Sequence, residues 1–509
     1  MIETTVKILP LAIVLGMFFL FTLAGLKTGK KQASEYGFHG GYSGSLGIGA
    51  AIASNWMSAA SFFGIAGMFY LKGYYAMAFV VGWTGGYVLL LVLMATQIRR
   101  FGKYSAPDFV GSRYESDAAR TMAALISIII AVIYVTAQFK GIALVVAWIF
   151  GTAYFPSVVI GVFIVVGFVV VSGVLGVTRN QQLGYFVLIT AFILPLMFLT
   201  RKLGYFWILP QFGYGDALAE LQSRSDLVWS GDLFPTNSLY GWLALCFTLM
   251  FGTAGLPHVL SRFYQTPGMR DARWGVVWGL FFISLIYWSA PAYAVLGRFF
   301  EIKNALPFST EPDYADMVIL HATVYGGVPS WVTGFLAAGG VCAAFSTGSS
   351  LLLTGSASFS YDIYPRLIRS NASESDKLMV SKGFFLVLAL VSMFLAFVTD
   401  RFMIAEIAAL AFALAGNTIF PAFLLGIWWK RANSAGVIAG MASGVCITFL
   451  PFLGKFSAVF GELLPFTSSA FLGAPAVICV MVLVSLFTPP PSPEMANFLN
   501  ETVHKEIEN

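Results

Sequence analysis

The chain has 509 residues, of which 58% are hydrophobic and only 10% are charged, and its formal net charge is +5. Soluble domains carry about 25% charged residues, so the composition excludes an ordinary soluble protein. Apolar runs of about 20 residues recur along the whole chain and predict an all-α, polytopic membrane protein in contact with lipid, without a nucleic-acid partner.

Thirteen apolar segments are long enough to cross a membrane. An odd number places the two termini on opposite sides, and one set of loops holds most of the Lys and Arg residues. The positive-inside rule then predicts an inner-membrane protein with its N-terminus outside and its C-terminus in the cytoplasm. The predicted spans are residues 8–26, 43–70, 75–97, 121–150, 155–178, 181–200, 238–257, 274–298, 328–360, 383–399, 403–428, 434–453 and 468–487.

The first span is not a cleaved signal peptide. Its apolar run, residues 8–26, is followed by Lys27, Lys30 and Lys31. A signal peptide carries its positive charge before the apolar run and a small-residue cleavage site after it. We therefore expect this helix to remain in the membrane.

The second span, which contains Leu46–Met68, is apolar but crowded with glycine and serine. Small residues let other helices approach closely, and hydroxyls supply oxygen atoms where water is absent. We predict an interruption within Ala53–Ser58, which is tolerable in lipid only if the freed carbonyls meet a cavity or a ligand. An unbroken, tightly packed helix is the alternative that this stretch leaves open.

A second interruption is predicted five spans later. Residues 251–258 (FGTAGLPH) place two glycines and a proline at the end of an apolar run, and proline removes a backbone donor. Breaks at equivalent places in two halves indicate a transporter built from inverted repeats. The predicted organisation is an N-terminal helix and loop (1–40), a five-helix repeat (41–200), an external loop (201–237), a second repeat (238–430), two C-terminal helices (431–487) and a tail (488–509).

Residues 341–351 (VCAAFSTGSSL) hold four hydroxyls in five positions of an apolar helix. The hydroxyls of Ser346 and Thr347, with the carbonyl of Ala343, offer three oxygen ligands of the kind that Na⁺ accepts. Carbonyls freed between Ser54 and Met57 could complete the set. The alternative is that these hydroxyls only join helices by hydrogen bonds.

The pattern Ala343-x-x-Ser346-Thr347-x-Ser349, followed by residues 362–364 (DIY), resembles the sodium/solute symporter family over residues 42–431. Residues 57–62 (MSAASF), 137–138 (AQ) and 251–263 (FGTAGLPHVLSRF) resemble its acetate-permease branch. The resemblance implies a LeuT-type fold and Na⁺ as the coupling ion. It also implies an ion site at Ala343, Ser346, Thr347, Ser54 and Met57, and, because Asn180 stands near an expected aspartate, no strong second sodium site.

Most of the predicted substrate contacts lie at the two interruptions, and two, Gln138 and Lys140, lie in the span at residues 121–150. A helix N-terminus favours a carboxylate, and the half-helix that begins near Ser58 offers one, together with Ser61. Trp56, with Phe62 and Phe63 nearby, suggests a small pocket, although Trp56 could instead only pack against a neighbouring helix. The predicted set is Trp56, Ser58, Ser61, Gln138, Lys140 and Leu256.

Lys140 is the one Lys or Arg in the interior of a predicted span, and a charge at this depth indicates a functional role. Two interpretations remain open: an ion pair with Glu406 as a structural or outer-gate bridge, or a counter-ion role toward the substrate carboxylate. The four cysteines (Cys246, Cys342, Cys446 and Cys479) are interpreted as small core residues.

These residues together predict a Na⁺-coupled symporter for a small monocarboxylate such as acetate. A membrane sensor of the same fold and a symporter for another small solute such as proline are the alternatives. No nucleophile–base pair or metal-ligand spacing is evident in the sequence, so an enzyme is not expected.

Overall fold

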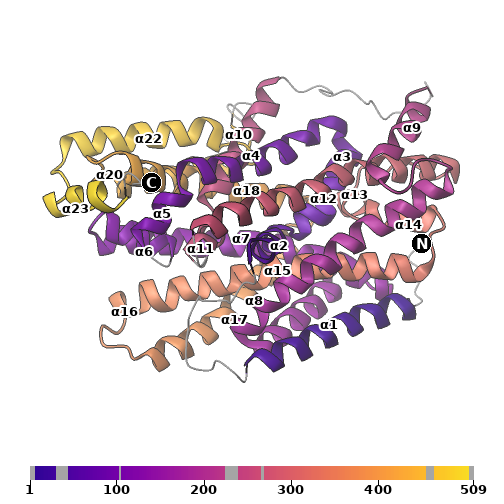
Figure 1. Ribbon diagram of the computed structural model, residues 1–509, viewed down its shortest axis with the longest axis horizontal. Helices are drawn as coiled ribbons and strands as arrows, with labels where there is room; N and C mark the ends of the chain where they lie inside the picture. The colour runs from indigo at the N-terminus through magenta and orange to yellow at the C-terminus, as the bar shows by residue number, and fades with distance from the viewer. Residues whose placement is uncertain are drawn as a thin grey trace.

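The computed structural model of the chain describes residues 6–29, 44–102, 105–223, 239–264, 269–453 and 464–503. Across these ranges the regular elements are helices, without a strand. The long helices run along the long axis of the molecule (Figure 1), with short helices gathered at its two ends. One end carries α16 (Tyr364–Leu367) and α23 (Pro493–Phe498), and the other carries α9 (Pro210–Ser223), α13 (Pro312–Asp316) and α14 (Val318–Tyr325).

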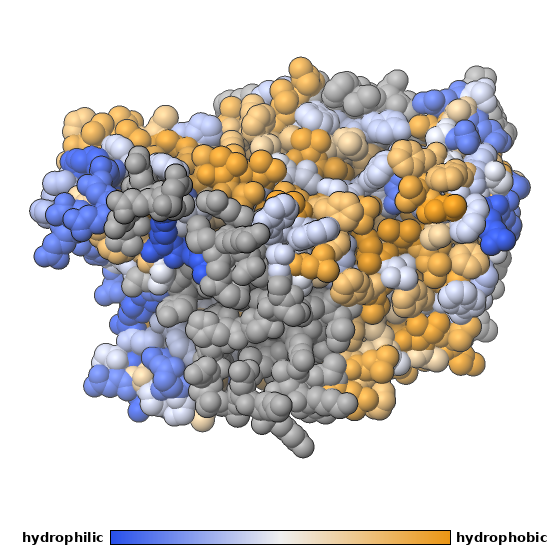
Figure 2. Space-filling view, viewed as in Figure 1, coloured by the Kyte–Doolittle hydropathy of each residue, from blue (hydrophilic) through white to orange (hydrophobic). Residues whose placement is uncertain are grey.

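A band of hydrophobic surface separates two hydrophilic ends (Figure 2), as a bilayer requires. In the described part of the chain, nine helical segments are long and apolar enough to cross a membrane, and three apolar helices are shorter. The all-α membrane class is confirmed, whereas the count of thirteen spans stays a prediction. The nine are Ala60–Leu93, Asp117–Phe150, Gly184–Lys202, Trp274–Lys303, Ser330–Leu367, Glu374–Val398, Ile404–Trp428, Ser434–Phe452 and Ala470–Phe487; the three shorter are Ile8–Phe21, Tyr154–Val169 and Leu239–Gly255.

The first half of the core opens on an interrupted helix, as predicted. Helix α2 (Gly44–Trp56) ends before Met57 and Ser58, and the chain resumes as the π-helical turn η1 (Ala60–Gly64) and α3 (Ile65–Lys72). Gly73 then adopts φ 54°, a conformation that side chains disfavour, and η2 (Gly73–Ala76) turns the chain into the next helix. The half continues with α4 (Met77–Leu93), α5 (Ala95–Phe101), α6 (Ala106–Arg113), α7 (Asp117–Phe150) and α8 (Tyr154–Lys202).

Helix α8 differs from the prediction of two spans joined at residues 179 and 180. It is helical from Tyr154 to Lys202, through the expected connection. The side chains of residues 170–183, among them Asn180, lie outside the described set, so the prediction about a second sodium site stays untested.

The second half also opens on an interrupted helix. Helix α10 (Leu239–Gly255) ends before Leu256, and α11 (Pro257–Tyr264) follows, with proline at the first helical position, where no backbone donor is needed. The second predicted interruption is therefore confirmed. The half continues with α12 (Met269–Lys303), α15 (Ser330–Ala357), η3 (Ser358–Ile363), α17 (Glu374–Val398), α18 (Ile404–Asn417) and α19 (Ile419–Trp428).

Helices outside the two halves pack on their edges. Helix α1 (Ile8–Gly29) packs along α8 and α15, and α20 (Ser434–Phe449) packs against α22 (Ala470–Phe487). The interpretation of all four cysteines as core residues was wrong for Cys446 and Cys479, which are exposed on this edge pair, while Cys246 and Cys342 are buried. Hydropathy could not separate these positions because a lipid-facing position is as apolar as a buried one. Two short helical turns, η4 (Leu450–Phe452) and η5 (Leu499–Val503), complete the described elements.

Candidate ion and substrate site

The interruption of α2 leaves carbonyls of its last turn to partners other than backbone N–H groups. The Ser54 carbonyl accepts a hydrogen bond from the Ser346 hydroxyl at 3.1 Å, and the Asn55 carbonyl accepts one from the Thr347 hydroxyl at 3.0 Å. The Trp56 carbonyl lies 3.5 Å from the Ser61 hydroxyl. The break therefore presents a row of carbonyl oxygens to hydroxyls, two of which come from α15.

The predicted ion ligands are buried inside the molecule. The Ser54 and Ser346 hydroxyl oxygens are 3.2 Å apart, and Ser54, Met57, Ala343 and Thr347 are completely buried, with Ser346 4% exposed. The structure thus brings Ser54, Ser346 and Thr347 together across 292 positions of sequence. Their hydrogen bonds also satisfy the helix-joining alternative, so ion binding stays a prediction for these residues.

Asn55 belongs to the same cluster and was missed by the sequence prediction. Its carbonyl, and not that of Met57, accepts the Thr347 hydroxyl. Its place in the last turn before the interruption is the signal that could have found it, because every carbonyl there loses its helical donor.

Gln138 of α7 supports the far side of the interruption. Its side-chain oxygen accepts the Ala59 N–H at 2.8 Å, and its amide nitrogen donates to the Tyr134 carbonyl at 3.2 Å. Ala59 begins the second half-helix, whose first N–H groups lack helical partners. Gln138 therefore stabilises the interruption by accepting a hydrogen bond from an N–H group that has no helical partner. Its predicted contact with substrate stays a prediction.

Trp56 lies among aromatic rings from three other helices. Its ring packs edge-on to Tyr87 of α4 (centroids 4.7 Å apart) and Phe412 of α18 (5.7 Å), and its indole N–H donates to the hydroxyl of Tyr287 of α12 at 2.8 Å. Phe62 and Phe63 lie elsewhere: Phe62 packs on Phe192 of α8, and the Phe63 ring lies against Gly340 of α15. The wall around Trp56 is thus formed by rings that the sequence prediction did not select, because only the packing of distant helices assembles them.

Ser58 and Ser61 join this aromatic cluster. The Tyr134 hydroxyl donates to the Ser58 hydroxyl at 3.2 Å, and the Ser61 hydroxyl lies 3.1 Å from that of Tyr287. Leu256, at the second interruption, is completely buried, and the neighbouring Gly255 lies against the Ala415 carbonyl. The structure therefore brings Trp56, Ser58 and Ser61 together, and the second break approaches the same cluster, because the ring centroid of His258, two positions after Leu256, lies 5.8 Å from that of Tyr134.

Lys140 lies beyond this cluster, in a cage of oxygen atoms near the end of the molecule that carries α13. Its ammonium is 2.7 Å from Asp313 and donates to the carbonyls of Asp400 and Phe402, each at 2.7 Å. The predicted pair with Glu406 was wrong, because Glu406 pairs with Lys72 at 3.4 Å. A role for Lys140 in binding the substrate carboxylate stays a prediction, and it requires the ammonium to leave these partners.

Asp316 of α13 lies in the same group of charged residues as Lys140, Asp313 and Glu406. It is completely buried, one of its oxygens accepts the Ile404 N–H at 2.9 Å, and the other has no hydrogen-bond partner among the described residues. Burial raises the pKa of Asp316 to about 7, and the positive charge of Lys140 opposes this rise. Asp313 and Glu406 add to the rise by repulsion.

The raised pKa predicts a pH dependence of stability. A carboxyl whose pKa is about 7 in the folded protein and 3.8 ordinarily binds its proton more tightly when folded. Stability should therefore be greatest below the lower value, decline as the pH rises between the two, and reach its minimum above the upper one. We expect the unfolding temperature to fall between about pH 4 and about pH 7, and Asp316→Asn to reduce this fall.

Thermal unfolding in detergent at a series of pH values measures this. Asp376→Asn is the control, since Asp376 lies in an exposed capping box at the start of α17 and should leave the decline in place. An equal decline in wild type and Asp316→Asn would show that another group causes it.

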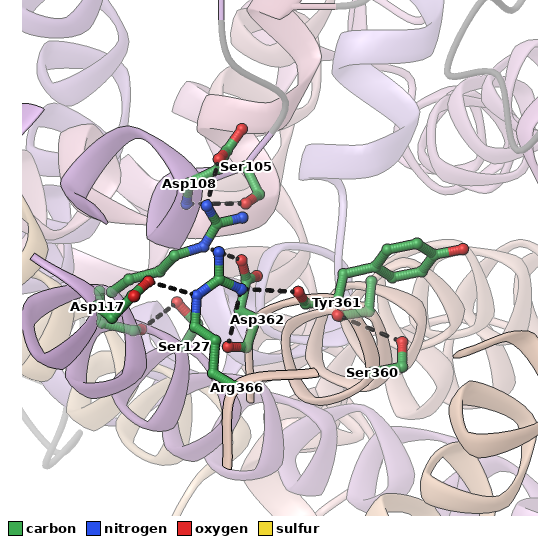
Figure 3. A network of polar contacts seen from close by, with 11 residues as sticks. Ser105, Asp108, Asp117, Ser127, Ser360, Tyr361, Asp362 and Arg366 are labelled. Carbon is green, nitrogen blue, oxygen red and sulfur yellow. Dashed lines mark hydrogen bonds and ion pairs between the residues drawn. The ribbon is translucent and has the colours of Figure 1, made fainter. Parts of the chain in front are cut away.

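A second ionic network lies near the other end of α7 and joins α6, α7, η3 and α16 (Figure 3). Arg120 contacts Asp108 at 2.8 Å and Asp362 at 2.7 Å, and Arg366 contacts Asp117 at 2.6 Å. Twenty residues of helix separate Arg120 from Lys140, which is about 30 Å. The helical core thus has one ionic network toward each of its two ends.

Arg120→Met is expected to lower the free energy of unfolding by about 1–3 kcal/mol, because it leaves the Asp362 carboxylate, only 2% exposed, without its partner. Arg369→Met is the control: its side chain is 59% exposed and pairs with Asp376 at 3.2 Å, and exposed ion pairs contribute about 0–1 kcal/mol. Denaturation of both purified variants measures the difference. Equal stability of the two would contradict the importance of the buried carboxylate.

Two helices interrupted at equivalent places in two five-helix halves are typical of secondary transporters. The family model of the sodium:solute symporter family matches residues 36–444 of this chain, and the chain belongs to this family. It is accordingly a transporter and not an enzyme, Na⁺ is its coupling ion, and a small solute is its substrate. The acetate-permease branch stays a prediction.

Similar proteins support the same class. An uncharacterized symporter of Cupriavidus necator is 28% identical over 95% of this chain and 92% of its own length. The uncharacterized symporter YwcA of Bacillus subtilis is 28% identical over 87% of this chain and 84% of its own length.

Among solved structures, the fold is similar to that of a Na⁺-coupled sialic acid symporter in a substrate-bound outward-open state. That match has a TM-score of 0.74 at 17% identity and covers 95% of this chain and 99% of the other. Mhp1, a nucleobase-cation-symport-1 family transporter, matches with a TM-score of 0.54 at 12% identity, over 90% of this chain and 96% of its own. These matches confirm the LeuT-type fold.

Proposed function

We propose that this protein imports a small monocarboxylate, acetate or a similar short organic acid, together with Na⁺ across the inner membrane. Its N-terminus then lies outside the cell and its C-terminus in the cytoplasm. The observation that carries the proposal is the contact between α15 and the interrupted α2, in which the hydroxyls of Ser346 and Thr347 lie on the carbonyls of Ser54 and Asn55.

Sodium is a hard cation, and its binding would replace the hydrogen bonds between these hydroxyls and carbonyls. The Ser346 and Thr347 hydroxyls can rotate so that their lone pairs, together with the carbonyls of Ser54, Met57 and Ala343, face the ion. Because the ligands come from two helices that move in different halves of the fold, bound sodium favours the state in which α2 and α15 are close. The ion's affinity for one state over the other is what couples it to transport.

The substrate would lie beside the ion, on the aromatic side of the same break. Trp56, Ser58 and Ser61 lie within two to seven positions of Ser54 in the sequence, and Tyr134 and Tyr287 supply hydroxyls that reach them. Closely packed rings with hydroxyls between them suit a small solute. The segment 251–263, similar to that of acetate permeases, supports a short acid as that solute.

Uptake of radiolabelled acetate by proteoliposomes tests the proposal. Above pH 7 little acetic acid is present to cross the bilayer unaided, and protein-free liposomes correct for what does. We expect accumulation with an inward Na⁺ gradient, loss of accumulation when choline replaces Na⁺, and competition by propionate. Equal uptake in choline would overturn sodium coupling to acetate, and binding of acetate without flux would favour a sensor. Competition by proline but not by propionate would overturn the monocarboxylate assignment.

A further inference from the structure

Trp83 of α4 carries a buried hydrogen-bond donor that meets no acceptor in the part of the chain that the structure describes. Its side chain is 1% exposed, and its indole N–H has no hydrogen-bond acceptor among the described residues. Buried tryptophan N–H groups normally find a partner, because losing water without replacing its hydrogen bond is unfavourable. Trp56, which packs edge-on against Trp83 with centroids 6.4 Å apart, follows that rule by donating to Tyr287.

The indole of Trp83 is held on several sides by other rings. Its centroid lies 5.3 Å from that of Phe79, 5.9 Å from that of Tyr287 and 5.6 Å from that of Phe412. These rings belong to α4, α12 and α18, and Trp56 adds a contact from α2. The packing fixes the direction of the N–H, so a rotation of the side chain toward water is not available to satisfy it.

The surroundings of Trp83 suit an acceptor that is small, flat and largely apolar. The polar groups described around the cluster are the hydroxyls of Ser58, Ser61, Tyr134 and Tyr287, the side chain of Gln138, which bonds to Ala59 and Tyr134, and the buried His258 ring, whose centroid lies 5.8 Å from that of Tyr134. The buried ammonium of Lys140, two positions after Gln138, already pairs with Asp313 and donates to two backbone carbonyls. An anion bound here would therefore have its charge balanced by the co-transported Na⁺ rather than by a lysine.

We propose that the Trp83 indole N–H donates a hydrogen bond to a carboxylate oxygen of the transported acid, whose apolar part packs against the surrounding rings. This inference rests on the proposed function and adds the residue that recognises the carboxylate. It also predicts the substrate class: a monocarboxylate with a short apolar remainder, since the cluster offers rings and one unused donor to such a molecule.

Trp83→Phe tests the inference because it removes the donor and keeps an aromatic ring. We expect the KM for acetate and propionate to rise roughly tenfold, as for the loss of one hydrogen bond to a charged group. Without substrate, the unfolding temperature should fall less in Trp83→Phe than in Trp56→Phe, because both lose buried ring packing but only Trp56→Phe also loses a hydrogen bond. The shift in unfolding temperature caused by Na⁺ alone should match that of wild type.

Two further variants serve as controls. Trp242→Phe removes another indole N–H without an acceptor in the described residues, on a partly buried side chain of α10 outside this cluster, and should leave the KM unchanged. Trp56→Phe breaks the bond to Tyr287 and should lower the unfolding temperature without substrate by more than Trp83→Phe does.

The outcomes separate the inference from the function on which it rests. Sodium-driven acetate or propionate uptake by wild type, with an unchanged KM in Trp83→Phe, would overturn the role of Trp83 and leave the function in place. A lower unfolding temperature of Trp83→Phe with an unchanged KM would assign Trp83 to packing alone. Failure of wild type to transport either acid with Na⁺ would overturn the proposed function and this inference with it.

Discussion

Ser346→Ala combined with Thr347→Val should nearly abolish sodium-driven uptake, and each single variant should raise the Na⁺ concentration for half-maximal uptake by about 10–100-fold. Each change removes one oxygen from an ion held by few ligands, and a bond to a charged group contributes about 1.5–3 kcal/mol. The affected hydroxyls are buried against the Ser54 and Asn55 carbonyls, so water cannot easily take their place.

Thr354→Val is the matched control. Thr354 lies on the same helix, but its hydroxyl bonds back to the Ser350 carbonyl at 2.8 Å. Uptake by proteoliposomes over a range of Na⁺ concentrations gives the half-saturation values, and this control should keep the wild-type value.

Thermal unfolding with and without Na⁺ separates ion binding from helix joining. An ion that binds only the folded protein raises its stability, so the Ser346 and Thr347 variants should lose the sodium-induced rise. If the hydroxyls only join α2 to α15, the variants will be less stable at every Na⁺ concentration and will keep that rise. That result would remove both residues from the proposed ion site.

Lys140→Met should lower the free energy of unfolding by about 1–3 kcal/mol, because two buried carbonyls lose a charged donor, while Asp313, whose side chain is 42% exposed, can still meet solvent. The ammonium is completely buried and bridges Asp313 of α13 to the carbonyls of Asp400 and Phe402, which precede α18. Its loss also leaves the buried Asp316 without the positive charge that opposes its raised pKa. Denaturation of the purified variant gives the value.

Lys72→Met is the control for this prediction. Lys72 pairs with Glu406 at 3.4 Å, but its side chain is 41% exposed, so its loss should cost at most about 1 kcal/mol. The KM for acetate distinguishes the two roles of Lys140. A structural bridge predicts a KM within about threefold of wild type in Lys140→Met, whereas a substrate counter-ion predicts a rise of about tenfold or more. Wild-type stability of Lys140→Met would contradict the bridge.

The sequence by itself determined the class of fold, both helix interruptions and the family. These features depend on local properties: hydropathy over about 20 residues, glycine and proline where a helix cannot continue, and the hydroxyl-rich stretch 341–351. The pairing of Ser346 with Ser54 was also predictable, because an interrupted helix in lipid must present its carbonyls to some oxygen-rich partner.

Only the tertiary structure decided which faces and which charges meet. Lys140 pairs with Asp313 across 173 positions and not with Glu406, and Trp83, Tyr287 and Phe412 come from three helices to enclose Trp56. The sequence likewise could not show that Cys446 and Cys479 are exposed. In a membrane both faces of a helix are apolar, so hydropathy does not show which face is buried, and a buried ion pair depends on how the intervening loop folds back onto the bundle.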